Sequence, residues 1–323
     1  MDTSIIIVSW NTRDILRNCL KSVYEQTKDI PFEVIVIDNA SSDNSVSMIK
    51  SEFSQVHLIE NKENRGFAAG VNQGIAIVKG RYVLVLNSDT IICDNAIEKT
   101  IRYADTHPEA AMVGCQVSDN FDTIQMTCFR FPSVLNLFLY TFSLNKIFKK
   151  NHFFGREWML WWRRNSEREV EVVSGSFMLV RRKAIDDIGL MDEDYFLYYE
   201  ETDWCYRFAK AGWKILFWPG AKIIHCHGGR NSSKQESTKM AIQMQRSCLI
   251  FFRKNRNIAS SIMVRLLLIV SFACRFCFWT VALYVKYLLR NSSNYEKKKS
   301  AENWSVFKYC AFGCELRKKA NKS

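Results

Sequence analysis

Short unbroken runs of apolar residues alternate with amphipathic stretches through the first third of the chain. The clearest run, residues 82–86, holds five apolar side chains and stops at the polar residues Asn87, Ser88 and Asp89. An unbroken run this short predicts a strand buried on both faces, as in a parallel sheet. Similar runs predict further strands at residues 4–9, 32–37, 56–60 and 111–117.

Between these runs, apolar residues recur at the spacing of a helix with one buried face. Such stretches predict helices at residues 13–26, 45–53 and 94–103, and another that ends at Val78. Strands and helices that alternate across short connections are typical of a parallel sheet covered on both sides. The sequence therefore predicts an α/β fold with a mostly parallel sheet flanked by helices.

Polar side chains follow the first two predicted strands. Ser9 and Asn11 come after the first strand, and Asp38 and Asn39 come after the second. Parallel strands end at one edge of the sheet, which is where open α/β sheets bind their ligands. The Asp38 carboxylate can accept a hydrogen bond from a ribose hydroxyl or a base N–H. The alternative is a turn aspartate that bonds its own backbone.

Asp89 follows the strand at residues 82–86 in the same way, which makes it a candidate contact for a metal ion or ligand. The alternative is that Asp89 only caps the helix predicted to begin at Asp94. Upstream, Arg65 precedes a segment rich in small residues at positions 66–74. A guanidinium beside the start of a closely packed helix is suited to a diphosphate.

Residues 121–168 are aromatic and basic and show no clear periodicity. An excursion of this length in a compact domain is usually functional, so we interpret it as an acceptor-side flap that partly faces a membrane. The alternative is a helical insert whose aromatic residues form a small core of their own. Strand character returns at residues 170–180, interrupted by Ser174, Gly175 and Ser176, where the backbone can approach a sugar closely.

Three carboxylates lie within four positions at Glu200, Glu201 and Asp203. On a helix Glu200 and Asp203 share a face, and Asp203 is placed to form an ion pair with Arg207. Aromatic residues precede the acids and can raise a carboxyl pKa toward values useful to a general base. The alternative is an acidic helix start favoured by the helix dipole.

Further along, residues 212–217 predict a strand, and Trp218, Pro219 and Gly220 predict a turn after it. The next apolar segment ends at two histidines two positions apart, His225 and His227. In an extended segment they share one face, an arrangement that is structural more often than functional.

Four segments in this order resemble the inverting family 2 glycosyltransferases, and above all their rhamnosyltransferase-like branch. The segments are residues 6–11, 36–43, 64–72 and 86–89. The likeness extends over about residues 4–230. It implies the GT-A (Rossmann-like) fold, a nucleoside-diphosphate sugar donor, and Mg²⁺ or Mn²⁺ as cofactor.

The resemblance also implies roles for individual residues. Ser9, Asp38 and Asp43 would contact the nucleoside and Arg65 the donor. The other donor-side positions are Asn11, Asn39, Gly66, Asn72, Asn87, Ser88 and Gly175. Asp89 and His225 would hold the metal ion, although the Asp-x-Asp signature of the family reads Asn-Ser-Asp here.

The family carries Glu-Asp-x-Asp where this chain has the acids at 200–203, and the second acid is the base. That position is Glu201, so the resemblance implies Glu201 as the base with Glu200 and Asp203 as supporting acids. Inverting transfer needs such a base to deprotonate the acceptor hydroxyl, through a transition state that resembles an oxocarbenium ion.

The formal charge of +12 lies entirely in the last quarter of the chain. From residue 253 onward, fifteen Lys and Arg face three Asp and Glu, so residues 1–252 are neutral overall. We therefore expect no nucleic-acid binding, and a tail that faces an anionic partner. Eleven scattered cysteines and an apolar strand directly after Met1 indicate a cytoplasmic protein with reduced thiols.

Residues 258–289 are strongly apolar but interrupted by Arg265, Arg275 and Lys286, which fall within one narrow arc of a helix. This pattern predicts an amphipathic helix that lies in a membrane interface, aided by basic runs at 297–299 and 317–319. The alternatives are a short membrane span from about Leu266, a packed helical appendage, or a face for a homo-oligomer.

We therefore expect a catalytic domain at residues 1–235, with the flap at 120–168, and a basic helical tail at 236–323. The expected protein is an inverting glycosyltransferase at the inner face of the cell membrane. It would move a sugar, with rhamnose suggested by the branch, to a glycan or lipid-linked acceptor of a bacterial surface polysaccharide. The alternatives are a sugar-nucleotide nucleotidyltransferase and a non-catalytic scaffold that binds sugar or lipid.

Overall fold

The computed structural model describes residues 1–119, 121–148, 150–226, 237–289 and 294–313. The chain forms two compact units, and neither is a continuous stretch of sequence. The first unit holds residues 1–131 and 148–232, and the second holds residues 132–147 and 233–323. Two expected features, His227 and the basic run at 317–319, lie outside the described residues.

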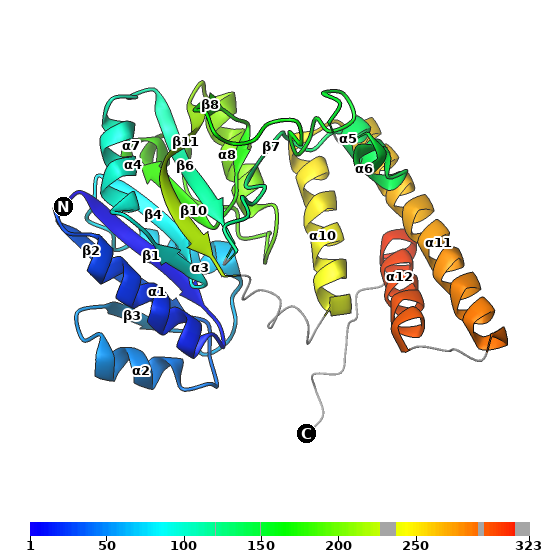
Figure 1. The fold of residues 1–323 in the computed structure, drawn as a ribbon, viewed down its shortest axis with the longest axis horizontal. Helices are drawn as coiled ribbons and strands as arrows, with labels where there is room; N and C mark the ends of the chain where they lie inside the picture. Colours follow the sequence, from blue (N-terminus) through cyan, green and yellow to red (C-terminus); the bar gives the residue numbers. More distant parts are fainter. Residues whose placement is uncertain (120, 149, 227–236, 290–293, 314–323) are drawn as a thin grey trace. The chain divides into compact units, whose positions relative to one another are not determined.

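A mixed sheet forms the centre of the first unit (Figure 1). In spatial order its strands are β3 (His57–Glu60), β2 (Phe32–Asp38), β1 (Thr3–Ser9), β4 (Tyr82–Asn87), β10 (Phe177–Arg181), β6 (Ala110–Ser118), β11 (Lys214–His225) and β5 (Thr90–Ile92), with β8 (Arg168–Glu169) beside β11. The first four are parallel, as are β6 and β11, whereas β10, β5 and β8 run antiparallel to their neighbours.

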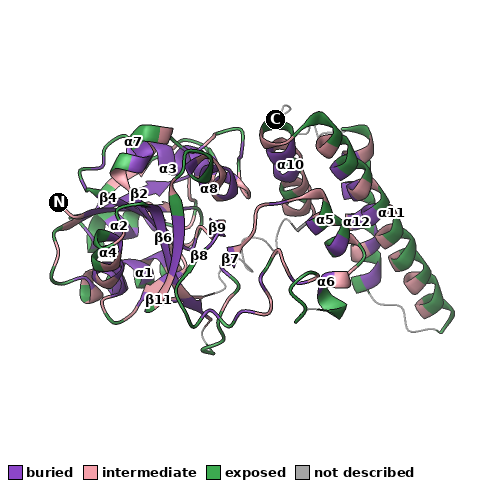
Figure 2. Cartoon of the chain, turned by 90° about the horizontal axis from the view of Figure 1, so that it is seen from above, coloured by how far each residue is buried: buried purple, intermediate pink, exposed green. Residues whose placement is uncertain are grey.

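Helices cover both faces of this sheet. On one face lie α1 (Arg13–Gln26), α2 (Ser45–Glu52) and α4 (Ala96–Asp105), and on the other α3 (Phe67–Ile75), α7 (Arg182–Ile188) and α8 (Glu200–Lys210). Neighbouring residues of one strand serve opposite faces, because Ile5 and Ile7 belong to the first core cluster and Ile6 to the second. Figure 2 shows the buried strands between the half-exposed helices. The predicted α/β class is confirmed.

The predicted turn at Trp218 is wrong, because this residue lies inside β11, which continues past an irregularity between Trp218 and Lys222. The alternative that Asp89 caps a helix is also wrong, because β5 separates it from α4, whose N-cap is Asn95. The predicted interruption of the strand character at residues 170–180 is confirmed. Before residue 174 lies β9 (Val172–Val173), in a small sheet with β7 (Cys128–Phe129), and after residue 176 lies β10 in the main sheet.

The segment between β7 and β8 is divided between the two units. Within the first unit, buried Arg164 fastens it by donating to the carbonyl oxygens of Trp158, Met159, Trp162 and Cys128. Trp162 meets Phe217 of β11 edge to face, with ring centroids 5.0 Å apart. Trp161 and Trp162 therefore join the main core, whereas Phe148, Phe153 and Trp158 stay partly exposed.

The second unit is helical. It contains α5 (Val134–Thr141), α6 (Leu144–Ile147), α10 (Ser237–Asn255), α11 (Ile258–Leu288) and α12 (Asn294–Phe312). Within it α5 and α12 both pack against α11, and α10 contacts α11 and α12. Among the described residues, α11 alone is long and apolar enough to cross a membrane by length and composition.

Candidate active site

The parallel register brings the predicted donor-side residues to one edge of the sheet. Ser9 lies opposite Asp38 across β1 and β2, and Val8 lies opposite Asn87 across β1 and β4. A chain of hydroxyl groups continues from this edge. Ser9 Oγ is 2.9 Å from Thr12 Oγ1, which donates to Ser88 Oγ at 3.3 Å. Residues from the ends of three strands therefore share one polar surface.

The Asp38 carboxylate makes the turn contact that the sequence offered as one interpretation. Its Oδ2 accepts the Ser41 backbone N–H at 2.8 Å. Its Oδ1 is buried and has no hydrogen-bond partner among the described residues. A buried carboxylate oxygen without a partner costs free energy, so this atom is available to accept a hydrogen bond, and its contact with a nucleoside stays a prediction.

Two neighbouring predicted residues hold loops in place. Asn11, at a positive φ of 54°, receives the Ser42 backbone N–H at 2.8 Å and joins the loops after β1 and β2. Asp43 accepts the Arg13 backbone N–H at 2.8 Å and also bonds Ser45. Burial raises the pKa of the Asp43 carboxyl, but these hydrogen bonds outweigh burial and leave the pKa below its ordinary value. Their nucleoside contacts stay predictions.

Gly66 allows the loop before α3 to contact the loop that precedes the acid cluster. Its φ is +86°, and a Cβ at this position would collide with the carbonyl oxygen of Phe196. The next residue, Phe67, donates its backbone N–H to that same oxygen at 2.8 Å. On the other side, Asn39 Nδ2 donates to the Gly66 carbonyl oxygen at 3.0 Å. Only glycine allows this close approach.

Arg65 and Asn72 meet a residue that the sequence analysis did not single out. Arg65 Nη2 lies 3.8 Å from Glu193 Oε2, and Asn72 Nδ2 donates to Glu193 Oε1 at 3.0 Å. Asn72 also exchanges hydrogen bonds with the backbone of Met191. Asn72 thus fastens the loop before α8, while Arg65 is half-exposed and positioned by a weak, solvent-screened ion pair.

The predicted metal ligands Asp89 and His225 lie together, although 136 positions separate them. Asp89 Oδ1 is 3.0 Å from His225 Nε2, and the Cys226 backbone N–H donates to the Asp89 carbonyl oxygen at 2.8 Å. The antiparallel pairing of β5 with β11 produces this contact, because Thr90 is opposite His225. The short strand β5 is therefore the element that assembles the pair.

The hydrogen bonds of His225 fit a metal ion. His225 Nδ1 lies 3.0 Å from Gln125 Oε1, which only accepts, so Nδ1 carries the proton. Nε2 can either donate to the neighbouring Asp89 carboxylate as an ion pair or give its lone pair to a cation that the two side chains hold together. Among the described residues no group of three His, Cys, Asp or Glu side chains gathers as a metal site. A bound ion would therefore complete its shell with ligand oxygens and water.

The acid cluster begins α8, and its three carboxylates have different surroundings. Asp203 Oδ2 accepts from Arg207 Nε at 2.8 Å, which confirms the predicted ion pair, and its Oδ1 accepts from the Tyr195 hydroxyl at 3.4 Å. Glu200 and Glu201 each keep one buried oxygen, Oε2, without a hydrogen-bond partner among the described residues. Both oxygens of Asp203 are therefore used in contacts that hold the structure together, whereas each glutamate keeps one oxygen available.

Burial raises the pKa of Glu201 to about 7. Burial also raises the pKa of Glu200 well above its ordinary value, and the neighbouring charge of Glu201 adds to that effect. A carboxyl that titrates near neutral pH can take a proton from a hydroxyl more readily than an ordinary one, because it is the stronger base. The pair is suited to proton transfer.

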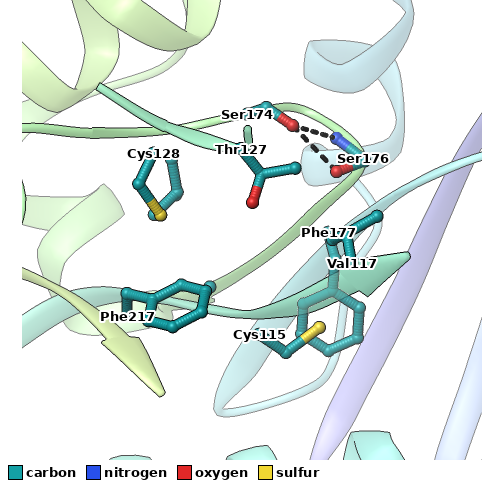
Figure 3. A pocket seen from close by; sticks show the side chains of 10 residues that line it. Cys115, Val117, Thr127, Cys128, Ser174, Ser176, Phe177 and Phe217 are labelled. Carbon is teal, nitrogen blue, oxygen red and sulfur yellow. Dashed lines mark hydrogen bonds between the residues drawn. The ribbon is translucent and has the colours of Figure 1, made fainter. Parts of the chain in front are cut away.

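The turn at Ser174, Gly175 and Ser176 lies beside the end of β4, where the Asn87 backbone N–H donates to the Ser176 carbonyl oxygen at 3.3 Å. A Cβ at Gly175 would meet only the Phe67 ring, at 3.7 Å, which is an ordinary contact. Figure 3 shows the side chains that line a small pocket behind this turn. It is too narrow for a water molecule, so it is a packing gap and not a substrate pocket.

Three contributors to the site were missed. Gln125 lies in the segment without periodicity, so nothing in its sequence position connects it with His225. Thr12 follows the polar residues singled out after the first strand and carries no signal of its own. Glu193 lies in an acidic loop with nothing to distinguish it from its neighbours, and its role depends on contacts with Arg65 and Asn72 across about 120 positions.

Comparison with known proteins gives a consistent picture. Residues 4–189 match the family described as Glycosyl transferase family 2. The N-acetylglucosaminyl-diphospho-decaprenol L-rhamnosyltransferase of Mycobacterium tuberculosis is 26% identical over 252 residues, covering 73% of this chain and 80% of that protein. Rhamnosyltransferase WbbL of Escherichia coli K12 is 27% identical and covers 68% and 82%.

Two solved structures share the fold. The mannosyltransferase PcManGT from Pyrobaculum calidifontis, in complex with GDP-Man and Mn²⁺, superposes with a TM-score of 0.56 at 14% identity. That match covers 97% of this chain and 88% of the other. GalNAc-T7 with UDP, GalNAc and Mn²⁺ gives a TM-score of 0.53 at 14% identity, over 70% and 44% of the two chains.

Proposed function

The chain belongs to glycosyl transferase family 2, and from this premise we propose that it moves a hexose from a nucleoside-diphosphate donor to a glycan or lipid-linked acceptor, with inversion. Two relatives that cover most of the chain are named rhamnosyltransferases, which supports L-rhamnose as the sugar. The acceptor of one of them is carried on a polyprenyl diphosphate by its name, which supports a lipid-linked acceptor in the synthesis of a surface polysaccharide.

The observation that supports this function best is that residues suited to binding the nucleoside, binding the diphosphate and accepting a proton are held by connected loops at one edge of the sheet. Asp38 offers a buried carboxylate oxygen to the nucleoside, and Arg65 offers a guanidinium to the diphosphate. The backbone bond from Phe67 to Phe196 then places the chain that leads into Glu200 and Glu201 beside the donor loop. The residues proposed to bind the sugar donor and the residue proposed to accept the proton are thus held by the same part of the fold.

A divalent ion, Mg²⁺ or Mn²⁺, would be held by Asp89 and His225. When bound, the ion neutralises the charge that develops on the departing diphosphate. Gln125 fixes the His225 ring and keeps its Nε2 directed at Asp89, so the chain presents one carboxylate and one imidazole without rearrangement. Mn²⁺ is present in both of the solved neighbours.

Glu201 would act as the base. Its raised pKa allows it to accept the proton of the attacking acceptor hydroxyl as that oxygen bonds the anomeric carbon and the diphosphate leaves from the opposite face. Glu200, whose pKa is raised well above its ordinary value by burial and by the charge of Glu201, would hold a proton beside it and spare the site a second negative charge. Asp203 supports the helix through Arg207.

The second unit would hold the enzyme at the inner face of the cell membrane, where a lipid-linked acceptor is found. One long apolar helix and a strongly basic tail support this location.

A panel of nucleotide sugars tests the proposal. We expect one sugar nucleotide, with dTDP-rhamnose tested first, to bind in the presence of Mn²⁺ or Mg²⁺ and at least about tenfold more weakly with EDTA. Transfer to a polyprenyl-diphosphate-linked sugar should then be lost in Glu201→Gln and Asp89→Asn. If both variants keep full function, the chain is a binding scaffold and not an enzyme.

A further inference from the structure

One side of helix α11 packs within its unit, and the opposite side is apolar and exposed. The three basic residues that share one arc of this helix each make a contact within the unit, although Arg265 itself stays exposed. Arg265 Nε donates to the Cys310 carbonyl oxygen at 2.9 Å, and Lys286 Nζ lies 2.5 Å from Glu296 Oε1. The Arg275 guanidinium lies 5.4 Å from the centres of the Tyr140 and Phe272 rings. The buried residues Val264, Leu268 and Phe272 lie on the same side of the helix, so this side packs within the unit.

The partner helix α12 presents polar side chains to this covered arc. Its buried positions include Glu296, Ser300 and Asn303. Thr280 Oγ1 of α11 lies 2.9 Å from Ser300 Oγ, between the two bonds at the ends of the pair. Together these contacts fix α11 and α12 as an antiparallel pair, here called the hairpin, in which hydrogen bonds and charges lie beside buried apolar residues such as Val264 and Val306.

The opposite side of α11 is apolar and exposed. It is defined here as the outer face, made of Ile262, Leu266, Val270, Cys277, Val281 and Leu288. Leu266 is 56% exposed and Val281 is 61% exposed. Figure 2 shows exposed residues along the length of α11. A helix in a water-soluble protein has the reverse arrangement, with its apolar stripe against the core and its polar stripe outside.

We propose that the outer face of α11 is the surface by which this chain enters the acyl region of a lipid bilayer, with α12 as its polar backing. In lipid, apolar contact no longer holds helices together, and polar contacts between helices replace it. The hairpin has polar contacts of this kind between α11 and α12. Its length suffices, since α11 has 31 residues and about 20 span a bilayer.

Charge favours the same occupant over a second copy of this chain. The region from residue 253 carries a net +12, and Lys297 and Lys298 are exposed at the start of α12. Two such surfaces would repel each other, whereas an anionic bilayer attracts both. The inference deepens the proposed location at the membrane and rests on it.

Vesicle flotation of the full chain provides the test. Phosphatidylcholine vesicles with about 30% phosphatidylglycerol are compared with pure phosphatidylcholine, each at low salt and at about 0.5 M NaCl. We expect binding to both, and expect the bound fraction on anionic vesicles to persist at high salt because the contact is apolar. Binding that disappears completely at high salt would show a purely electrostatic contact and overturn the proposal.

Substitutions on the outer face give a sharper test. The double variant Leu266→Glu with Val281→Glu should bind at least roughly tenfold more weakly, because charged side chains are costly in the acyl region. The matched control is Ile77→Glu with Leu190→Glu, two residues of the first unit that are each 46% exposed. Equal binding by the double variant and the wild type, or an equal loss in the control, contradicts the proposal.

Two further measurements separate misfolding and self-association from loss of lipid contact. A nitrobenzoxadiazole label on Cys277, in a chain with Cys274→Ser and Cys314→Ser, should brighten and shift to the blue with vesicles. No change would overturn the inference. Sedimentation without lipid would reveal a dimer that the double variant dissociates, and such a dimer without vesicle binding would assign the face to a second copy. Donor binding in solution should be unchanged in the double variant, so the proposed transferase activity stands or falls separately.

Discussion

The sheet of the first unit and the hairpin of the second are built on opposite plans. In the sheet, apolar strands such as β4 are buried, and the polar groups collect where the strands end. In the hairpin, polar contacts join the two helices beside a few buried apolar residues, and a row of apolar groups is exposed outside. The first plan suits water as the solvent and leaves a polar edge for ligands. The second suits lipid, so one chain is adapted to two solvents.

The largest effect is expected at the acid cluster that begins α8 in the first unit. Glu201→Gln should lower kcat by roughly 10²- to 10⁴-fold, because the amide cannot accept the proton of the acceptor hydroxyl. Donor binding should change little. Steady-state kinetics measure the loss, and Glu109→Gln, an exposed acid beside Lys214, is the control that should behave as wild type.

A matched pair of leucines tests the two plans by stability. Leu84→Ala, in the core of β4, should lower the free energy of unfolding by about 2–5 kcal/mol, because it leaves a cavity in packed surroundings. Leu266→Ala, on the outer face of α11, should change it by less than about 0.5 kcal/mol in water. Chemical denaturation measures both. Similar losses at the two positions would mean that Leu266 is packed in solution.

The polar contacts between α11 and α12 should contribute less to the free energy of unfolding than the apolar core of the sheet. Lys286→Met removes the ammonium group beside buried Glu296 and should cost about 1–3 kcal/mol, moderated because Lys286 is itself half-exposed. Exposed Lys297→Met is the control and should be nearly neutral. Helix-specific hydrogen exchange locates the effect, and a loss confined to α11 and α12 is expected.

The smallest effect concerns pH. The folded pKa of Glu201, about 7, lies above its ordinary value of 4.5, so the folded state holds the proton more tightly than the unfolded chain. Its stabilising contribution is complete below about pH 4.5 and is lost as the pH rises through about 7. Glu201→Gln should therefore flatten the fall of the melting temperature between pH 5 and 8. An unchanged pH profile would contradict the assignment.

The sequence predicted best those features that depend on neighbouring residues. The helix at residues 13–26 agrees with α1 because its apolar residues repeat with helical period, and the run at 82–86 lies within β4. The three-residue β5 was missed because so short a strand has no periodicity, and Pro219 concealed the continuity of β11. Apolar periodicity reflects interactions between residues that are close in the sequence, whereas β5 and the continuity of β11 depend on pairing with strands that are distant in the sequence.

The candidate site shows the same division. Asp38 and Ser9 could be placed together from the order of strands, and the structure aligns them. The pairing of Asp89 with His225 came from the family resemblance, since nothing in the spacing joins them. The arc of Arg265, Arg275 and Lys286 was recognised, but its direction was not, because the sequence of one helix does not state which side its neighbour covers.

The insertion of α5 into the helical unit has a practical consequence for anyone who shortens this protein. The polypeptide leaves the catalytic unit at residue 132 and returns by residue 148, and in that interval α5 packs on α11. Cutting the chain after residue 232 would strip α5 of its partner and bare Leu139, which is now 3% exposed. If the truncated protein precipitates, the cause would therefore be the exposed apolar surface of α5 after the loss of α11. A clean catalytic fragment needs two cuts and a short bridge across residues 132–147.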